Sequence, residues 1–411
     1  MIAWLAVAAL AQDPAVTAEV HGNAKTFFLA TFPYENELLM PAGPYGQGVA
    51  SGRVAFTARA IDHFTLEIHP AFTAQSGTDN PLGETVGTGV GLSAPEAVDL
   101  TWTNDDDDGT LTMIGRIDWL SLRTSYPGID VTLGRQAIGF GNGLFFTPMD
   151  LVNPFTATTI DTEYRPGVDA VRVDGFMGMS GKISGVAAYA GDWDLEGTVL
   201  AVHGQGTLGV TDLGGFVGSI HAEPVFGVGV VTSIGPVGIH SDTTLTLPVE
   251  EDPFVRSVVG ATWIQGNTTL SGEAYVQTFG AENPNQYLVV ATADRFARGE
   301  VWQMGRYYGA LSLGHQITPL ISGSLAVIAN LQDPSAMLAP NLSWSVSENA
   351  DLSLGGYAGL GTKPEEVDPF DLLKPGTLEP LGPKKLGSKL GVQSEFGLIP
   401  VTTFLQMRAY F

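Results

Sequence analysis

The chain has 411 residues, of which 15% are charged and 52 are glycine, and it contains no cysteine. Soluble proteins contain roughly one quarter charged residues, so this composition favours a large β protein or a membrane barrel. The lack of cysteine excludes disulfides and thiolate metal sites. The formal net charge of −24 argues against a nucleic-acid partner, because binding to phosphates requires Lys and Arg.

The chain begins with an apolar, alanine-rich run that ends in Ala9-Leu10-Ala11. Small residues at this spacing are typical of the cleavage site of a secretory signal peptide. We therefore predict a signal peptide over residues 1–11 and a single mature domain over residues 12–411. The run is short and has no Lys or Arg before it, which a start codon further upstream would explain. A buried N-terminal strand or helix is the alternative.

Alternation of polar and apolar residues dominates the middle of the chain, with clear examples at 128–136, 267–279 and 350–360. No internal stretch is apolar over the about 20 residues that a membrane-spanning helix requires. A strand with one face in lipid and one face in a wet lumen alternates in this way. The pattern predicts an all-β fold, a transmembrane antiparallel β-barrel of about 16–18 strands.

The predicted connections fall into two sizes. Tight turns rich in Gly, Pro and Asn are predicted near residues 62–63, 126–128, 180–181, 235–236, 266–267 and 318–319. Long loops are predicted at 31–48, 76–109, 139–167, 280–299 and 362–384. Because short periplasmic turns and long external loops are typical of outer-membrane barrels, the pattern predicts the cell outer membrane as the location, with contacts to its lipid and lipopolysaccharide.

The C-terminal segment alternates from Val401 to Tyr410 and ends on Phe411. A terminal strand that ends in an aromatic residue resembles the signal that bacterial barrel assembly machinery recognises. We therefore expect that machinery to be a partner of this chain. A chance Phe at the end of a soluble strand is the alternative.

One region departs from simple alternation: GRQAIGFGNGLFFTPMDLVNPFTATTIDTEYRPGVDAVRVD, at residues 134–174. Its order of GRQ, F-G-x-G, F-x-P-x-D, N-P and D-x-E-Y-R-x-G-V-D-A resembles a porin-like outer-membrane β-barrel family of Proteobacteria. The match covers about a tenth of the chain, and Phe140 stands where the family often has Trp. The resemblance implies an outer-membrane barrel in which a long loop joins two strands; it implies no substrate.

We predict that the inserted loop at 139–167 folds into the lumen and narrows it. Charged and polar residues in and beside it are candidates for a constriction or for ion pairs that pin the loop: Arg135, Asp150, Asn153, Glu163, Arg165, Asp169 and Arg172. The simpler interpretation is that these ion pairs only lock the loop. The strand patterns also direct a further set of charges to the lumen, namely Arg116, Asp118, Asp174, Arg256, Glu273 and Asp351.

A second motif raises the question of a metal. Asn104, Asp106 and Asp108 alternate and are followed by Gly109, like the first half of a calcium loop. Gly115 stands where such a loop has its bidentate Glu. A solvated acidic loop tip is therefore the favoured interpretation, and calcium on the 104–109 loop is the one cofactor considered.

The sequence favours a non-enzymatic, porin-like channel for passive passage of a small solute, and it contains no G-x-S-x-G motif or metal-ligand spacing of its seven histidines. The oligomeric state is open, and a homotrimer is the assembly that a porin-like barrel would suggest. The alternatives are a non-conducting structural or adhesive barrel and, less favoured, a membrane enzyme with a site on the rim.

Overall fold

The structure is a computed structural model that describes residues 16–36, 40, 43–61, 63–77, 95–106, 110–152, 164–249, 251–366, 371, 373–374 and 380–411. Its strands are β1 (Val16–Phe32), β2 (Tyr45–Ala60), β3 (Phe64–Gly77), β4 (Thr101–Asp105), β5 (Leu111–Tyr126), β6 (Ile129–Gln136), β7 (Val168–Met177), β8 (Gly181–Tyr189), β9 (Thr198–Leu208), β10 (Thr211–Ile220), β11 (Glu223–Ile234), β12 (Val237–Thr246), β13 (Phe254–Gln265), β14 (Thr268–Gln277), β15 (Tyr307–Thr318), β16 (Ile321–Asn330), β17 (Ser335–Ser347), β18 (Ala350–Leu360) and β19 (Val401–Tyr410). Short helical turns are η1 (Pro284–Gln286), α2 (Tyr287–Ala291), α3 (Asp294–Ala297), α4 (Pro383–Lys389) and η3 (Phe396–Leu398).

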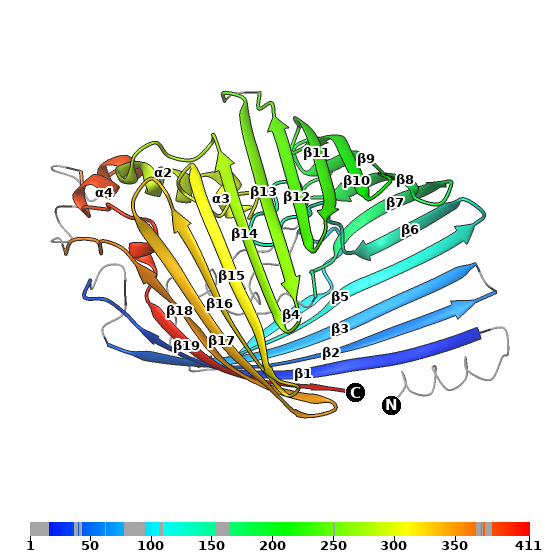
Figure 1. Cartoon of the computed structure of the whole chain (residues 1–411), viewed down its shortest axis with the longest axis horizontal. Helices are drawn as coiled ribbons and strands as arrows, with labels where there is room; N and C mark the ends of the chain where they lie inside the picture. The colour runs from blue at the N-terminus through cyan, green and yellow to red at the C-terminus, as the bar shows by residue number, and fades with distance from the viewer. Residues whose placement is uncertain are drawn as a thin grey trace.

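The strands form one closed antiparallel sheet, in which β1 pairs with both β2 and β19 (Figure 1). The wall has eighteen strand positions, because β4 and β6 occupy the same edge of β5. β4 pairs with residues 112–116 of β5, and β6 pairs with residues 120–126. The predicted transmembrane barrel is confirmed, at the upper end of the predicted strand number. None of the described helices is long and apolar enough to cross a membrane.

The two ends of the barrel carry different connections: every connection at one end is two or three residues long, whereas the other end carries all the long ones and also the two-residue turn between β10 and β11. Tight turns lie at one end, at 61–63, 127–128, 178–180, 209–210, 235–236, 266–267, 319–320 and 348–349. The longest connections all lie at the other end, where α2, α3 and α4 gather (Figure 1). Both ends of the described chain lie at the tight-turn end, as an even number of strands requires.

The seam of the barrel is closed by the pairing of β19 with β1, which Phe411 extends by one residue. Phe411 exchanges backbone hydrogen bonds with Gly22 at 2.8 and 2.9 Å. A Cβ on Gly22 would lie 2.3 Å from the Phe411 ring, so glycine makes the room that this ring occupies. The terminal strand therefore pairs with β1 along its whole length, from Asn23↔Tyr410 to Phe32↔Val401.

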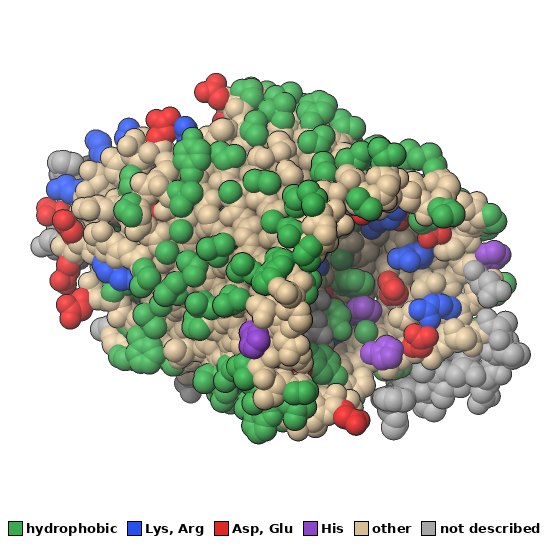
Figure 2. Space-filling model, viewed as in Figure 1, with side chains coloured by type: hydrophobic (Ala, Val, Ile, Leu, Met, Phe, Trp, Pro, Cys, Tyr) green, Lys and Arg blue, Asp and Glu red, His purple; other side chains and the backbone are tan. Residues whose placement is uncertain are grey.

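The outer face of the barrel is apolar because alternate residues of each strand point outward. On β19, Val401, Leu405 and Met407 are exposed, whereas Thr402 and Gln406 are buried on the inner side. Apolar side chains cover much of the face seen in Figure 2. In water such a surface would be an aggregation hazard; in a bilayer it is the lipid contact.

The inner face is filled unevenly. One buried apolar cluster joins Ile138, Met149 and Leu151 to the inner wall from β7 to β11. A second joins Phe146 to β13–β18 and to Phe396. Segments that leave the wall therefore fold back into the barrel and pack there.

The apolar outer face yields a stability prediction. Leu311, 60% exposed in the middle part of β15, should cost about 2–4 kcal/mol of unfolding free energy when changed to Arg, because a cation there must enter hydrocarbon. Leu331 is equally exposed at 65% but lies in the connection after β16, so Leu331→Arg is the matched control. Denaturant unfolding in lipid vesicles measures both, and equal costs would contradict a bilayer around this face.

Candidate functional site

The candidate site is built by residues 137–152, here called the crossing segment, which leaves the wall after β6. Two glycines along its path make room for close approaches, and the approach at Gly143, to a backbone carbonyl, admits only glycine. A Cβ on Gly143 would lie 1.8 Å from the carbonyl oxygen of Phe146, and one on Gly139 would lie 2.2 Å from the Arg165 guanidinium. The glycines of the F-G-x-G motif region therefore permit a tight path inside the barrel.

The tip of the crossing segment is held by one carboxylate on the far wall. Glu273 lies on β14, eight strand positions from β6, and is 5% exposed. It accepts hydrogen bonds from the backbone N–H groups of Leu144 (2.5 Å), Phe145 (3.0 Å) and Phe146 (3.0 Å). Its Oε1 also lies 2.8 Å from Nε2 of His240. Backbone donors that left the sheet thus find an acceptor across the lumen.

A second carboxylate, Asp242 on β12, holds the segment two residues earlier. It accepts hydrogen bonds from the backbone N–H of Asn142 at 2.5 Å and from its Nδ2 at 2.7 Å. Asp242 has no exposed surface. The two carboxylates hold residues 142–146 against β12 and β14, which is the geometry of a loop locked in place.

Aromatic packing adds to these polar anchors. Phe146 is fully buried and stacks on Tyr275 of β14, with ring centroids 4.7 Å apart and planes 4° apart. Trp302, in the loop after β14, stacks on the same ring at 5.8 Å. Phe146 therefore joins the crossing segment, the wall and the overlying loop in one stack.

Within the segment, Asp150 closes the loop on itself. Its Oδ1 accepts the N–H groups of Phe140 (2.7 Å) and Gly141 (2.8 Å), and Oδ2 accepts Nη2 of Arg165 at 2.7 Å. The structure thus brings together two of the predicted candidates, Asp150 and Arg165. The returning chain continues at Tyr164, whose ring lies 4.5 Å from the Arg53 guanidinium of β2.

Arg135 and Asp169 form a separate group where β6 ends and β7 begins. Nε and Nη2 of Arg135 each donate to Asp169 at 3.0 Å, a bidentate pair. Glu96 lies 3.1 Å from Nη1, and the carbonyl of Val98 accepts from Nη2 at 2.8 Å. This pair therefore ties residues 96–98, which precede β4, to the point where the crossing segment leaves the wall.

The remaining candidates lie elsewhere. Arg172 pairs with Asp174 at 3.0 Å, and Lys182 pairs with the same carboxylate at 3.3 Å, which is an ion-pair group on the wall strands β7 and β8. Asn153 and Glu163 lie outside the described residues.

The proposed calcium ligands lie in and after β4. Both carboxylate oxygens of Asp106 accept hydrogen bonds from Thr110, and Oδ1 also accepts from the N–H of Leu111 at 3.1 Å. Asn104 lies in β4, and Asp108 lies outside the described residues. Among the described residues no group of three or more possible metal ligands converges. The contacts of Asp106 are those of a carboxylate that orders a turn.

Below the crossing segment, toward the tight-turn end, the lumen is open to solvent. On the inner face of β1, Glu19 and His21 are exposed, whereas Asn23 and Phe27 are buried. The molecule is hollowed beside β5 and β6, and Lys, Arg, Asp, Glu and His side chains are visible in the hollow (Figure 2). We call this wet half of the lumen the vestibule; its wall carries the Glu19–Arg59 pair (2.9 Å).

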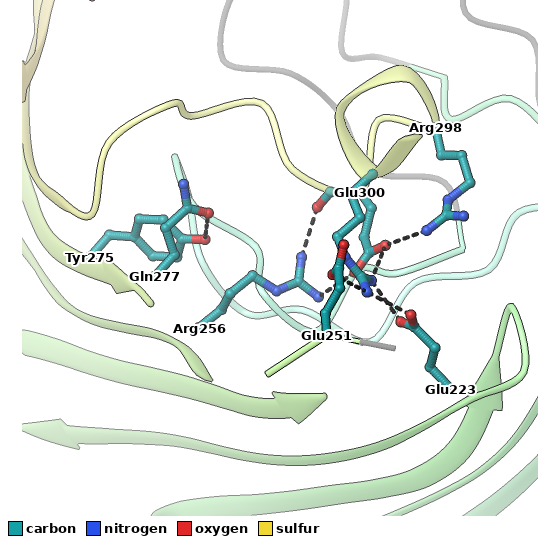
Figure 3. Close-up of polar contacts among 8 residues, drawn as sticks. Glu223, Glu251, Arg256, Tyr275, Gln277, Arg298 and Glu300 are labelled. Atoms are coloured by element: carbon teal, nitrogen blue, oxygen red, sulfur yellow. Dashed lines mark hydrogen bonds and ion pairs between the residues drawn. The ribbon is translucent and has the colours of Figure 1, made fainter. Parts of the chain in front are cut away.

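Above the crossing segment, residues 278–306 form the rim loop, which an ion-pair network ties to the wall (Figure 3). Arg295 of α3 donates to both oxygens of Glu223 at 2.5 and 2.6 Å, and it also pairs with Glu251 and Glu300. The backbone carbonyl of Glu300 accepts from Arg256 of β13 at 2.7 Å. Three arginines and three glutamates, counting Arg298, balance one another in this network.

The titration of these groups reflects their pairing. Burial alone would raise the pKa of Glu300, but the charges of Arg256, Arg295 and Arg298 outweigh it and hold that pKa below its ordinary value. Burial would lower the pKa of Arg295, yet its bonds to Glu223 and the charge of Glu300 raise it. Both groups therefore stay charged across the neutral range, and the rim loop stays fastened.

Sequence reasoning missed part of this site. Asp242 and Glu96 were not among the candidates, and Glu273 was expected only as a lumen charge. The alternating pattern of β12 and β14 places Asp242 and Glu273 on the inward side of the wall, and this was the signal by which they could have been found. Nothing in the sequence indicates that their partners are backbone groups of a loop about a hundred residues away.

This chain is similar to known proteins in its fold and not in its sequence. No family model matches the sequence, and no curated protein matches it. Solved structures do match: OccAB1 of Acinetobacter baumannii (8% identity, 96% of each chain covered, TM-score 0.56) and OccK5 (OpdH) of Pseudomonas aeruginosa (7% identity, 96% of this chain and 97% of that chain, TM-score 0.55). The outer membrane protein opdK of Pseudomonas aeruginosa is similar at 6% identity, 96% and 98% coverage and a TM-score of 0.54. At these identities the likeness establishes a shared barrel fold.

The Glu273 anchor can be tested by hydrogen exchange. Glu273→Gln keeps the shape but turns an amide toward the N–H groups of residues 144–146, so exchange there should speed up about 10- to 100-fold, the equivalent of about 1.5–3 kcal/mol. Glu67→Gln is the control, because Glu67 lies on the wall strand β3 and accepts a long, 3.4 Å bond from Ser121 of β5. Unchanged exchange at 144–146 in Glu273→Gln would contradict the anchor.

The rim loop offers a matched pair of variants. Arg295→Lys keeps the positive charge but loses the bidentate hydrogen bonds of the guanidinium to Glu223. Chymotrypsin should therefore cleave the rim loop roughly tenfold faster. Arg298→Lys, which loses a single 3.3 Å contact of a one-third-exposed side chain, should cleave like the native chain. Equal cleavage of the two variants would show that Arg295 does not fasten the loop.

Proposed function

We propose that this chain is an outer-membrane channel through which small solutes diffuse passively, narrowed by the crossing segment. The observation that carries the proposal is the segment itself, held across a closed barrel by Glu273 and Asp242 above an open, charged vestibule. A barrel that served only as a wall or an adhesin would not need an irregular segment locked at mid-lumen by buried carboxylates. Charged walls and pore width would set selectivity.

The lining of this path carries both signs of charge. Arg53 and Arg116 pair with Asp118, and Arg172 and Lys182 pair with Asp174. Such pairs of fixed charges suit polar solutes, because each charge or dipole of a solute finds a partner along the wall. No bond is made or broken, so passage requires no cofactor.

A second candidate function is a non-conducting barrel, and one observation favours it. The side chains of Tyr308 and Tyr287 have no exposed surface where the rim loop and the segment after residue 380 cover the wide end. If this cover is permanent, the vestibule is a closed pocket. A barrel of this kind would serve a structural or adhesive role.

Single-channel recording in planar bilayers separates the two functions. The native chain should give reproducible current steps, and a variant in which residues 140–149 are replaced by a short glycine-serine turn should give larger ones, because the constriction is gone. Silence of both proteins, with β-sheet circular dichroism and heat-modifiable migration intact, would rule out the channel. Steps of equal size would leave a channel but remove the crossing segment as its constriction.

A further inference from the structure

A buried carboxylate, that of Glu395, holds residues 390–399, which precede β19, inside the wide end of the barrel. Glu395 is 5% exposed and makes contacts to three separate elements. It accepts the backbone N–H of Met304 in the rim loop at 3.0 Å and Nδ2 of Asn330 at the end of β16 at 2.7 Å. The hydroxyl of Tyr308 on β15 also donates to it.

The groups that face Glu395 include a second acid, Asp333. Asp333, between β16 and β17, accepts the backbone N–H of Glu395 at 2.6 Å and the hydroxyl of Ser335 at 2.5 Å. The hydroxyl oxygen of Tyr287 in α2 accepts a hydrogen bond from Nδ2 of Asn330 at 3.0 Å. No ion pair between Glu395 and a Lys, Arg or His occurs within the part of the chain that the structure describes.

The next residue connects this acid to the constriction. Phe396 is 2% exposed, lies edge-on to Tyr308 with ring centroids 6.4 Å apart, and donates its N–H to Ser335 at 3.3 Å. It belongs to the same buried cluster as Phe146 at the tip of the crossing segment. The segment 390–399 therefore packs against the structure that narrows the lumen, and we call it the latch.

We propose that the latch is a pH-dependent element of the channel: docked in the mouth at acidic pH, and progressively released as the pH rises through neutrality into the alkaline range. The inference rests on the proposed channel function for its consequence, but the docking itself rests only on the contacts of Glu395. Release would withdraw Phe396 from the cluster that supports the crossing segment and would widen the mouth.

The direction of this pH dependence follows from the burial of the Glu395 carboxylate. Loss of solvent raises the pKa of Glu395 from about 4.5 to about 7, and the neighbouring Asp333 raises it too, while the hydrogen bonds from Tyr308, Met304 and Asn330 act against them. A group whose folded pKa is raised stabilises docking fully below its unfolded pKa and loses that contribution as pH rises through the folded value. Docking should therefore weaken from about pH 5 upward and be weakest above pH 8.

Cysteine labelling measures docking without reference to transport. The chain has no cysteine, so Val392→Cys, at a 4% exposed latch position, reports release, and Val249→Cys, at an 80% exposed position, corrects for the pH dependence of thiol reactivity. The ratio of maleimide labelling rates should rise about tenfold or more from pH 5 to pH 9; the shift in pKa sets an upper limit of about 300-fold. In Glu395→Gln the ratio of labelling rates should stay, at every pH, at the value that the native protein has at pH 5. Glu366→Gln changes an exposed carboxylate and should give the native pH dependence.

Each outcome decides the proposal. A rise in the native protein that Glu395→Gln abolishes supports the latch; a flat native ratio, or an equal rise in Glu395→Gln, overturns it. Single-channel conductance over the same pH range tests the consequence, and it should increase with the labelling ratio. If the labelling ratio rises with pH but no single-channel current is recorded, the latch is supported and the proposed channel function is ruled out. The failure of one proposal can therefore be told from the failure of the other.

Discussion

Residues 137–152 leave the sheet, and their backbone N–H groups must then find acceptors inside the barrel, because an unpaired buried donor is costly. Glu273 and Asp242 supply those acceptors from strands on the other side of the lumen. A carboxylate can accept several N–H groups at once and binds them more strongly than a neutral carbonyl. The position of the crossing segment, and with it the division of the lumen into a vestibule and a covered half, depends on these two side chains.

The same logic governs the wide end. Arg295 gathers three glutamates to hold the rim loop, and Glu395 gathers three donors to hold the latch. The two devices differ in charge balance: the first is a neutralised network that stays ionised, the second a carboxylate beside another acid. The barrel wall provides a rigid frame, and the loops inside it are fixed by a small number of charged residues.

Much of the architecture could be predicted because lipid imposes a strict alternation on every strand. The strands, the two classes of connection and the inserted loop followed from that alternation and from the turns at Gly128, Gly235 and Gly266, each of which has a positive φ. The pairing inside the site could not be predicted in the same way. Arg172 carries the inward pattern of its strand yet pairs with Asp174, and Asp242 looked like any inward acid until the loop was placed against it. Contacts between side chains and a distant irregular backbone leave no periodic pattern in the sequence.

The most direct test of the account is the single-channel conductance of a Glu273→Gln chain that also carries Asn142→Cys and Gly229→Cys. An ideal Cβ on Gly229 would lie 2.7 Å from the Asp242 carboxylate and 2.9 Å from the Asn142 side chain, so a disulfide between positions 142 and 229 would hold the crossing segment two residues before the N–H groups that Glu273 now binds. We expect conductance above the native value when the pair is reduced and a return toward the native value when the pair is oxidised. Conductance that is the same in both states, with the disulfide shown to have formed, would contradict a channel narrowed by an anchored crossing segment.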